Sequence, residues 1–360
     1  MRKTRNLLCF GWKIQLLASL MDMVHRTSHL LISARPKKDT MERILLCNWA
    51  SLGDVLLATS VIPLLKAHFP SAKIGFLVSK NSRKVLETCA GIDWIHEVES
   101  LPMVLCKPGL TLASKLWTWI RYTLKENRAI AKEIAKKNYS CAIDLYPFFP
   151  NSISILWHAK IPLRIGFDTG GNSHLLNVIA PWDEERYLTI QYDNLLKKLG
   201  IEGHVQPQVA IPKIPLPYKA PYLIFHPCSS GEYKEFPPHF WKELYEKCKK
   251  AGIAVYFTGH GAREEAFIEQ AGVAKEDRLC GQLSWNLFVA TLQASCGVVS
   301  VDSVPVHLAA ALDVPFAVLY RKYTKLWYPE TSKGTFFGKD EAISIDSVYS
   351  QIEKWIEKKS

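Results

Sequence analysis

The stretch that decides the fold is residues 301–312, VDSVPVHLAAAL. An apolar run, residues 297–301, ends in an acidic residue and a hydroxyl, and a helix of small residues follows at once. This succession predicts a strand, a turn and a helix of a parallel α/β sheet, and the unpaired N–H groups of such a helix favour phosphate. Asp302 either binds sugar hydroxyls or caps the helix, and His307 either faces the site or packs in the core. This segment alone leaves both interpretations open.

The same alternation of short apolar runs and helical stretches extends over most of the chain. The pattern predicts strands at residues 44–47, 74–78, 142–145, 222–226, 253–258, 297–301 and 316–320. It predicts helices at residues 55–68, 115–137, 188–199, 238–250, 263–271, 285–294 and 306–312. The economical interpretation is a doubly wound parallel sheet in each half of the chain.

Five prolines between residues 207 and 221 exclude a helix or a central strand there and predict an extended linker. We therefore expect an N-terminal Rossmann-like domain over residues 41–205, a linker over 206–221 and a second Rossmann-like domain over 222–335. A tail with a docking helix, residues 336–360, follows. In that helix, apolar side chains recur on one face, at Val348, Ile352, Trp355 and Ile356.

The net charge of +11 over 360 residues is regional. Residues 1–40 and 107–137 each hold eight Lys or Arg against two acids, which leaves the remainder of the chain at −1. This distribution favours an anionic partner such as lipid phosphates or a membrane surface. Zinc-finger spacing, RNA-binding aromatic signatures and a basic zipper are absent from the sequence, so nucleic acid is not expected as a partner. Nine scattered cysteines without a C-x-x-C pair indicate reduced, mostly buried thiols.

The first forty residues have two open interpretations. Their apolar stretch, residues 7–24, is interrupted by Lys13, Gln15 and Asp22, which makes it a poor membrane-spanning helix. It is either an amphipathic anchor at a membrane surface, or a mis-assigned start with Met41 as the true first residue.

The candidate catalytic residue of the first half is Asp54. It follows Gly53 directly after the first predicted strand, at the strand end where open α/β sheets place their ligands. A carboxylate there suits a general base, whereas the alternative is a cap for the helix that begins at Val55. The segment is not a dinucleotide fingerprint, because G-x-G-x-x-G is missing.

Two further strand ends in the second half carry groups that suit phosphate and ribose. Ser229, Ser230 and Lys234 follow the strand at 222–226 and form either a phosphate cradle or a solvated loop with capping serines. Gly261 and Glu265 follow the strand at 253–258, where an acid in the first helical turn binds a ribose hydroxyl or complements the helix dipole.

Together these segments resemble the two-domain GT-B glycosyltransferases, whose two lobes face a cleft. The residues of these motifs are similar to those of glycosyltransferase family 9, the bacterial heptosyltransferases of lipopolysaccharide core assembly. The resemblance spans residues 41–358 and rests on four ordered motifs: GDVLLAT at 53–59, His226-Pro227 with Lys234, Gly281 with Ser284, and VDS at 301–303 followed by HLAAAL at 307–312.

The resemblance implies a role for each matching residue. Asp54 is implied to be the catalytic base that takes the acceptor hydroxyl proton. The residues implied to bind the nucleotide sugar are Ser229, Ser230, Lys234, Gly261, Glu265, Gln282, Leu283, Asp302, Ser303 and His307. The family usually has glycine where this chain has Val304.

The implied reaction is inverting transfer of heptose from ADP-heptose to an inner-core acceptor that bears Kdo or lipid A phosphates. It needs no metal and no cofactor, because a lysine and a helix N-terminus stabilise the leaving diphosphate. We expect Gly53, Lys115, Arg121 and Lys125 to face the acceptor, although the basic segment also fits a solvated helix face. The expected location is the cytoplasm, peripheral to the inner membrane. The alternatives are another nucleotide sugar, a protein acceptor, or a non-catalytic GT-B binding protein.

Overall fold

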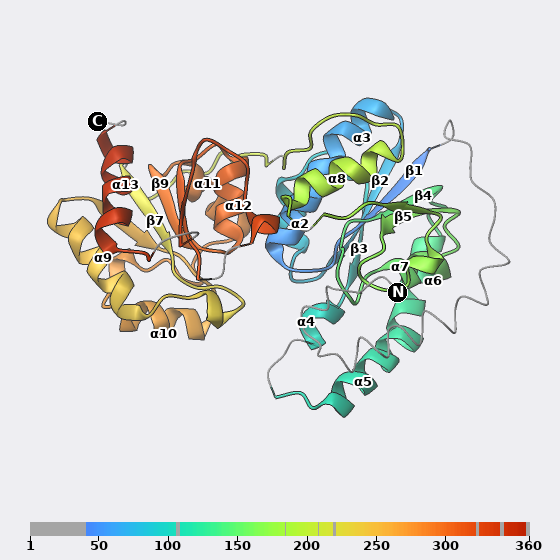
Figure 1. Ribbon diagram of the computed structural model, residues 1–360, viewed down its shortest axis with the longest axis horizontal. Helices are drawn as coiled ribbons and strands as arrows, with labels where there is room; N and C mark the ends of the chain where they lie inside the picture. Colours follow the sequence, from blue (N-terminus) through green and yellow to red (C-terminus); the bar gives the residue numbers. More distant parts are fainter. Residues whose placement is uncertain are drawn as a thin grey trace. The chain divides into compact units, whose positions relative to one another are not determined.

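The computed structural model describes residues 41–105, 109–183, 185–207, 209–218, 221–321, 324–338 and 342–357. The chain divides into two compact units, Met1–Gln208 and Val209–Ser360, and the division falls within the proline-rich segment. The expected extension over residues 1–40 lies outside the described residues. Helices and strands of both units are labelled in Figure 1.

Unit 1 is built on a six-stranded sheet in which every neighbouring pair of strands is parallel. The spatial order is β3-β2-β1-β4-β5-β6, so β1 lies in the middle of the sheet and the later strands are added on both sides of it. The strands are β1 (Arg43–Cys47), β2 (Lys73–Ser79), β3 (Trp94–Val98), β4 (Cys141–Asp144), β5 (Leu163–Phe167) and β6 (Val178–Ala180). This order confirms the doubly wound parallel sheet predicted for the first half.

The helices of unit 1 are α2 (Leu52–Ala58), α3 (Ile62–His68), α4 (Leu101–Leu105), α5 (Leu112–Arg121), α6 (Asn127–Ala135), α7 (Ile153–His158) and α8 (Leu188–Lys197). The single helix expected over 55–68 is interrupted by a 3₁₀ turn, Thr59–Val61, before α3. Pro63 occupies the first turn of α3, where its missing N–H costs nothing. The basic helical region is likewise divided, because a π-helical turn, Tyr122–Glu126, joins α5 to α6.

Unit 2 holds a five-stranded parallel sheet in the order β11-β10-β9-β7-β8. Its strands are β7 (Tyr222–His226), β8 (Ala254–Phe257), β9 (Gly297–Val301), β10 (Phe316–Leu319) and β11 (Gly334–Phe337). The helices are α9 (Pro238–Lys250), α10 (Ala262–Gln270), α11 (Trp285–Gln293), α12 (Val304–Ala311) and α13 (Ile345–Glu357). Two parallel-sheet α/β units confirm the predicted fold class. The sequence pattern missed β11, which pairs with β10. This strand spans residue 335, where the second domain was expected to end and the tail to begin.

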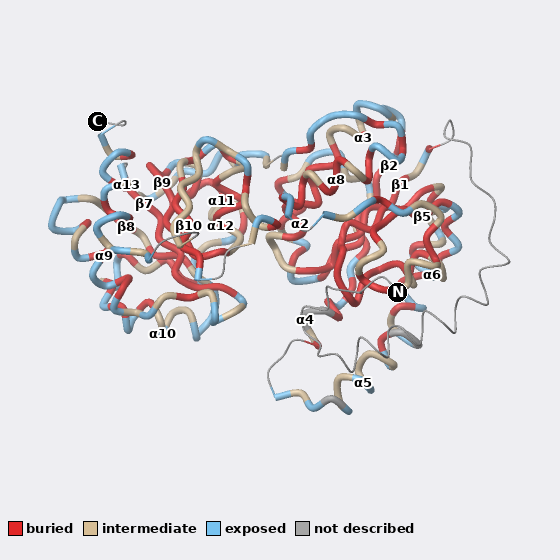
Figure 2. Tube along the Cα trace, in the orientation of Figure 1, coloured by how far each residue is buried: buried red, intermediate tan, exposed pale blue. Residues whose placement is uncertain are grey.

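The core of unit 2 lies between its sheet and the flanking helices, and the strands β7, β9 and β10 are buried along their whole length (Figure 2). Val348, Ile352 and Trp355 of α13 belong to this core, so the predicted apolar face packs as expected. A Cβ at Gly297 would lie 2.3 Å from the Trp355 ring, and glycine is therefore what allows α13 to approach β9. The tail described over 342–357 is thus part of unit 2.

Among the described residues, no helix combines the length and the apolar character that crossing a bilayer requires.

Candidate functional site

The loops after β7, β8 and β9 lie at one edge of the unit 2 sheet, because the strands are parallel neighbours. Open α/β sheets bind ligands at this carboxyl edge. The structure therefore brings together three segments that the sequence singled out one by one.

Lys234 and Asp302 form an ion pair across this edge. Lys234 Nζ donates to Asp302 Oδ2 at 2.7 Å, although 68 residues separate the two in sequence. The Asp302 side chain is 8% exposed and the Lys234 side chain 27% exposed. Asp302 is not the N-cap of α12; Ser303 takes that position, without a cap hydrogen bond from its side chain. Of the two interpretations of Asp302, capping of α12 is therefore wrong.

His307 lies one turn into α12 and is buried. Burial lowers its pKa to about 4, an effect that Asp302 opposes and Lys234 reinforces. The imidazole is therefore neutral at pH 7 and sits in the electrostatic field of the ion pair. His307 is therefore buried inside unit 2 and also lies near Asp302 and Lys234.

A buried carboxylate that the sequence analysis missed holds the loop after β7. Glu235 is 8% exposed and accepts the Ser229 backbone N–H at 2.7 Å. Arg263 of α10 donates to both Glu235 carboxylate oxygens, at 2.8 and 2.9 Å, and also to the Ser229 carbonyl at 2.9 Å. Arg321 donates to the Glu235 carbonyl at 3.1 Å. This cluster fixes the loop that carries Lys234, and we call it the Glu235 clamp.

The Ser229 hydroxyl is used inside the same loop, where it donates to the Gly231 carbonyl at 2.9 Å. Ser230 is exposed at the loop surface. The two serines therefore differ: Ser229 is buried and shapes the loop, whereas Ser230 is open to a ligand.

Two of the remaining candidates of unit 2, Glu265 and Gln282, lie beside Arg278. Glu265 lies 3.8 Å from the Arg278 guanidinium, and Gln282 Nε2 donates to the Arg278 carbonyl at 2.7 Å. Leu283, next in the chain, is half-buried. Gly261 has a φ of 89° at the start of α10, and a Cβ there would meet open space. The loops after β8 and before α11 thus offer backbone that a flat ligand can approach closely.

Asp54 occupies the third position of α2, directly after the carboxyl end of β1. Its Oδ2 accepts the Ser51 backbone N–H at 3.2 Å and the Ser51 hydroxyl, and the two residues form a capping box. The helix starts three residues earlier than expected, with Ser51 as the N-cap. Asp54 is 8% exposed, and its charge contributes to the raised pKa values of Tyr146 and Tyr192, whose main cause is burial.

A second carboxylate at this edge, Asp144, was not predicted as functional because it ends an apolar run. It is fully enclosed and accepts the backbone N–H groups of Tyr146 at 3.0 Å and Ser152 at 3.1 Å. Burial raises its pKa to about 7, against the effect of these hydrogen bonds. Asp144 therefore fixes the loop that follows β4.

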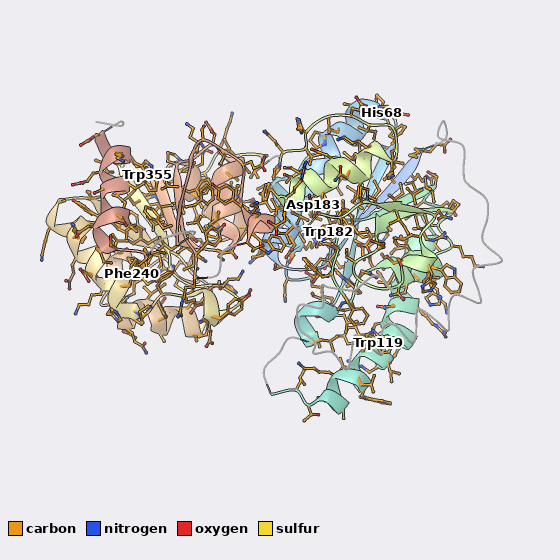
Figure 3. All side chains as sticks on the ribbon, viewed as in Figure 1. His68, Trp119, Trp182, Asp183, Phe240 and Trp355 are labelled. Atoms are coloured by element: carbon orange, nitrogen blue, oxygen red, sulfur yellow. The ribbon has the colours of Figure 1, made fainter. Side chains whose placement is uncertain are left out.

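The expected acceptor residues lie on three different elements. Gly53 is on α2 beside Asp54, whereas Lys115 and Arg121 are on α5 and Lys125 is in the π-helical turn. Arg121 and Lys125 are exposed, and Lys115 is half-buried. Trp119, labelled in Figure 3, lies on α5 between Lys115 and Arg121 in sequence. In the part of the chain that the structure describes, no three His, Cys, Asp or Glu side chains gather as metal ligands.

Comparison with known proteins identifies the family. The model of glycosyltransferase family 9 (heptosyltransferase) matches residues 127–354, which is more than half of the chain. Lipopolysaccharide heptosyltransferase 2 of Salmonella typhimurium is 24% identical over 87% of this chain and 90% of its own length. The Escherichia coli K12 protein of that name is 23% identical over the same shares.

Solved structures agree in fold. The E. coli ADP-heptose lps heptosyltransferase II superposes with a TM-score of 0.70 at 20% identity, over 88% of this chain and 100% of that one. E. coli heptosyltransferase WaaC with ADP superposes with a TM-score of 0.68 at 19% identity, over 87% of this chain and 99% of that one. With the family model, these likenesses confirm the GT-B resemblance and the assignment as an enzyme: the chain belongs to glycosyltransferase family 9, the heptosyltransferases.

Proposed function

We propose that the protein transfers heptose from ADP-heptose to an anionic inner-core sugar of lipopolysaccharide, with inversion at the anomeric carbon and without a metal ion or cofactor. The observation that carries the proposal is the Lys234–Asp302 pair at the start of α12. The Lys234 cation and the helix N-terminus suit a diphosphate, and the neighbouring Asp302 carboxylate suits a sugar hydroxyl. The related proteins named above act on lipopolysaccharide or bind ADP by their titles.

In the proposed donor complex, unit 2 holds the nucleotide sugar. Ser230, Lys234 and the first N–H of α12 bind the diphosphate, and Asp302 turns from Lys234 to the sugar hydroxyls. Neutral His307 donates one hydrogen bond to a phosphate oxygen. Glu265, Gln282 and Leu283 border the nucleoside. The Glu235 clamp keeps the Lys234 loop in place, so that little ordering remains to be done when the donor binds.

In the proposed reaction, the acceptor oxygen bonds to the anomeric carbon from the face opposite the nucleotide. The bond from that carbon to the diphosphate oxygen breaks, and ADP leaves with the electron pair. Lys234 stabilises the charge that develops on the leaving group. Asp54 takes the proton of the acceptor hydroxyl late in the reaction, when the oxocarbenium-like carbon has made that hydroxyl acidic. A single displacement of this kind inverts the configuration.

We also propose that α5 contacts the cytoplasmic face of the inner membrane. Trp117 is 68% exposed and Leu116 is 37% exposed, although both are large apolar side chains. Arg121 and Lys125 follow Trp117 at intervals of four residues and are exposed. Interfacial helices combine an aromatic or apolar face with basic residues that attract anionic lipid.

The test is ADP release by the purified full chain with ADP-heptose and a Kdo-bearing lipid A acceptor. Asp54→Asn keeps the size of the side chain and removes the base, so we expect kcat to fall by about 100-fold or more, with the donor KM unchanged. Ser51→Ala is the matched control, because it removes half of the capping box and keeps the carboxylate; we expect it to lose less than about tenfold. Equal rates for Asp54→Asn and the unmodified chain would exclude Asp54 as the base.

A further inference from the structure

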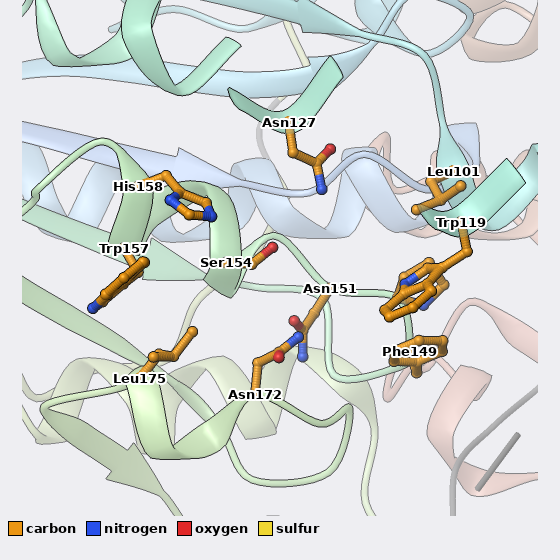
Figure 4. Close-up of a pocket in the computed structure, with 11 residues that line it drawn as sticks. Leu101, Trp119, Asn127, Phe149, Asn151, Ser154, Trp157, His158, Asn172 and Leu175 are labelled. Carbon is orange, nitrogen blue, oxygen red and sulfur yellow. The ribbon is translucent and has the colours of Figure 1, made fainter. Parts of the chain in front are cut away.

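A small cavity lies inside unit 1, at the same sheet edge as Asp54. Its volume is about 50 Å³, and its lining residues come from the segments after β3, β4 and β5 together with α5, α6 and α7 (Figure 4). The lining residues include Trp119, Asn127, Phe149, Asn151, Ser154 and Trp157. Since the carboxyl ends of parallel strands share one edge, this cavity lies where such sheets bind ligands.

Two buried amide oxygens of the cavity wall have no hydrogen-bond partner among the described residues. They are Oδ1 of Asn127 and Oδ1 of Asn151, and each residue is 3% exposed. The orientation of Asn151 is fixed, because its Nδ2 donates to the carbonyls of Gly170 at 2.9 Å and Gly171 at 2.8 Å. A Cβ at Gly170 would lie 2.8 Å from this Nδ2, so glycine is required for the contact. The amide oxygen of Asn151 is therefore a fixed acceptor that needs a donor.

Aromatic rings close the cavity on both sides. Trp119 and Phe149 lie next to each other on one side, with ring centres 6.4 Å apart, and Trp157 lies on the other side (Figure 4). Asn127 reaches into the space between them and directly follows the π-helical turn. Widened turns of this type often occur at functional sites. Amide acceptors between aromatic rings are suited to hydroxyl groups on a short carbon chain.

The cavity is also tied to the loop that presents Asp54. Trp49, at the end of β1, donates its indole N–H to the Pro150 carbonyl at 3.2 Å, between the cavity residues Phe149 and Asn151. Both loops leave neighbouring strands, since Cys47 of β1 pairs with Asp144 of β4. A ligand group held in the cavity is therefore positioned by the same framework as Asp54.

We propose that this cavity binds the exocyclic glycol of the acceptor sugar, that is, two neighbouring hydroxyl groups on a two-carbon arm. A volume of about 50 Å³ admits such an arm or a few water molecules and excludes a sugar ring, because whole-ligand sites measure roughly 300 Å³ or more. The hydroxyls donate to Asn127 and Asn151 and displace water. The choice of the acceptor as the source of the glycol rests on the proposed function.

The first experiment compares a Kdo-bearing acceptor with a synthetic analogue that has hydrogen in place of the glycol. We expect the unmodified protein to prefer the intact acceptor by about tenfold in kcat/KM. Asn127→Leu removes an acceptor oxygen, and Ser154→Val adds methyl groups that fill the space; each is expected to reduce the preference to less than about twofold. Ala129→Ser, at an exposed position of α6, is the matched control that keeps it. The proposal is overturned if both variants keep the tenfold preference, or if the unmodified protein shows no preference for the intact acceptor. The cavity would then hold water only.

The second experiment does not depend on transfer. Saturation-transfer NMR with free Kdo should show contact of the glycol protons with the unmodified protein and not with Ser154→Val. If no heptose is transferred, the proposed function fails, and this measurement still decides the cavity. Equal glycol signals with the two proteins would overturn the proposed site.

Discussion

The Glu235 clamp gives the sharpest prediction about stability. Glu235→Gln keeps the shape of the side chain and removes its charge, so the bidentate ion pair with Arg263 becomes at most one hydrogen bond from the charged guanidinium to a neutral amide oxygen. Breaking a buried ion pair costs about 3–5 kcal/mol. The Arg263 side chain is 43% exposed and keeps part of its hydration, which lowers the expected loss to about 2–3 kcal/mol. For a cooperative unit of the size of unit 2, Val209–Ser360, that loss corresponds to a fall of about 5–10 °C in Tm.

The assay is thermal and urea unfolding of the full chain at pH 7, followed for the transition of unit 2. Glu232→Gln is the matched control, because Glu232 lies 3.8 Å from the same guanidinium but is 78% exposed. We expect this control to change stability by no more than about 0.5 kcal/mol. If the two variants unfold at the same temperature, the clamp does not hold the loop and the reasoning is refuted. Under the proposed function, Glu235→Gln also weakens ADP binding, since the Lys234 loop loses its support.

Three further predictions follow from packing, titration and surface exposure. Gly297→Ala should lower unfolding stability by about 1–3 kcal/mol, because the new Cβ would lie 2.3 Å from the Trp355 ring; an unchanged Tm would contradict the contact. Burial lowers the pKa of His226 to about 4. Between about pH 6.5 and pH 4 the unfolded chain therefore binds a proton at this histidine and the folded chain does not, so the free energy of unfolding falls as the pH falls. His226 should therefore contribute about 2 kcal/mol to the change in unfolding stability between pH 7 and pH 5, measured by urea unfolding as the difference between the unmodified chain and His226→Gln, and an equal change in both would disprove the assignment. Trp117→Ser should reduce sedimentation with anionic vesicles several-fold relative to Thr118→Ser, and equal sedimentation would argue against α5 as the membrane contact.

Much of the fold follows from local patterns in the sequence. The alternation of apolar runs with helical stretches predicts the parallel sheets, and the prolines around 207–221 mark the segment in which the chain divides. In unit 1 the strands β3, β5 and β6 were missed. In β3 the apolar pattern is interrupted by His96, a polar residue that is buried only because Glu133 and Tyr139 bond to it, at 2.7 and 2.8 Å. Such a strand is visible only once its distant partners are known.

The sequence by itself determined which residue types stand at the strand ends, because periodicity and turn chemistry act over a few neighbouring residues. The tertiary structure decided which of them meet. Lys234 reaches Asp302 across 68 residues, and Glu235 reaches Arg263 across 28, once β7, β8 and β9 align in parallel. The same holds for Asn127 and Asn151, which line one cavity from two parts of the chain. Whether a polar group is paired, buried or open to a ligand depends on contacts that form only when the chain has folded.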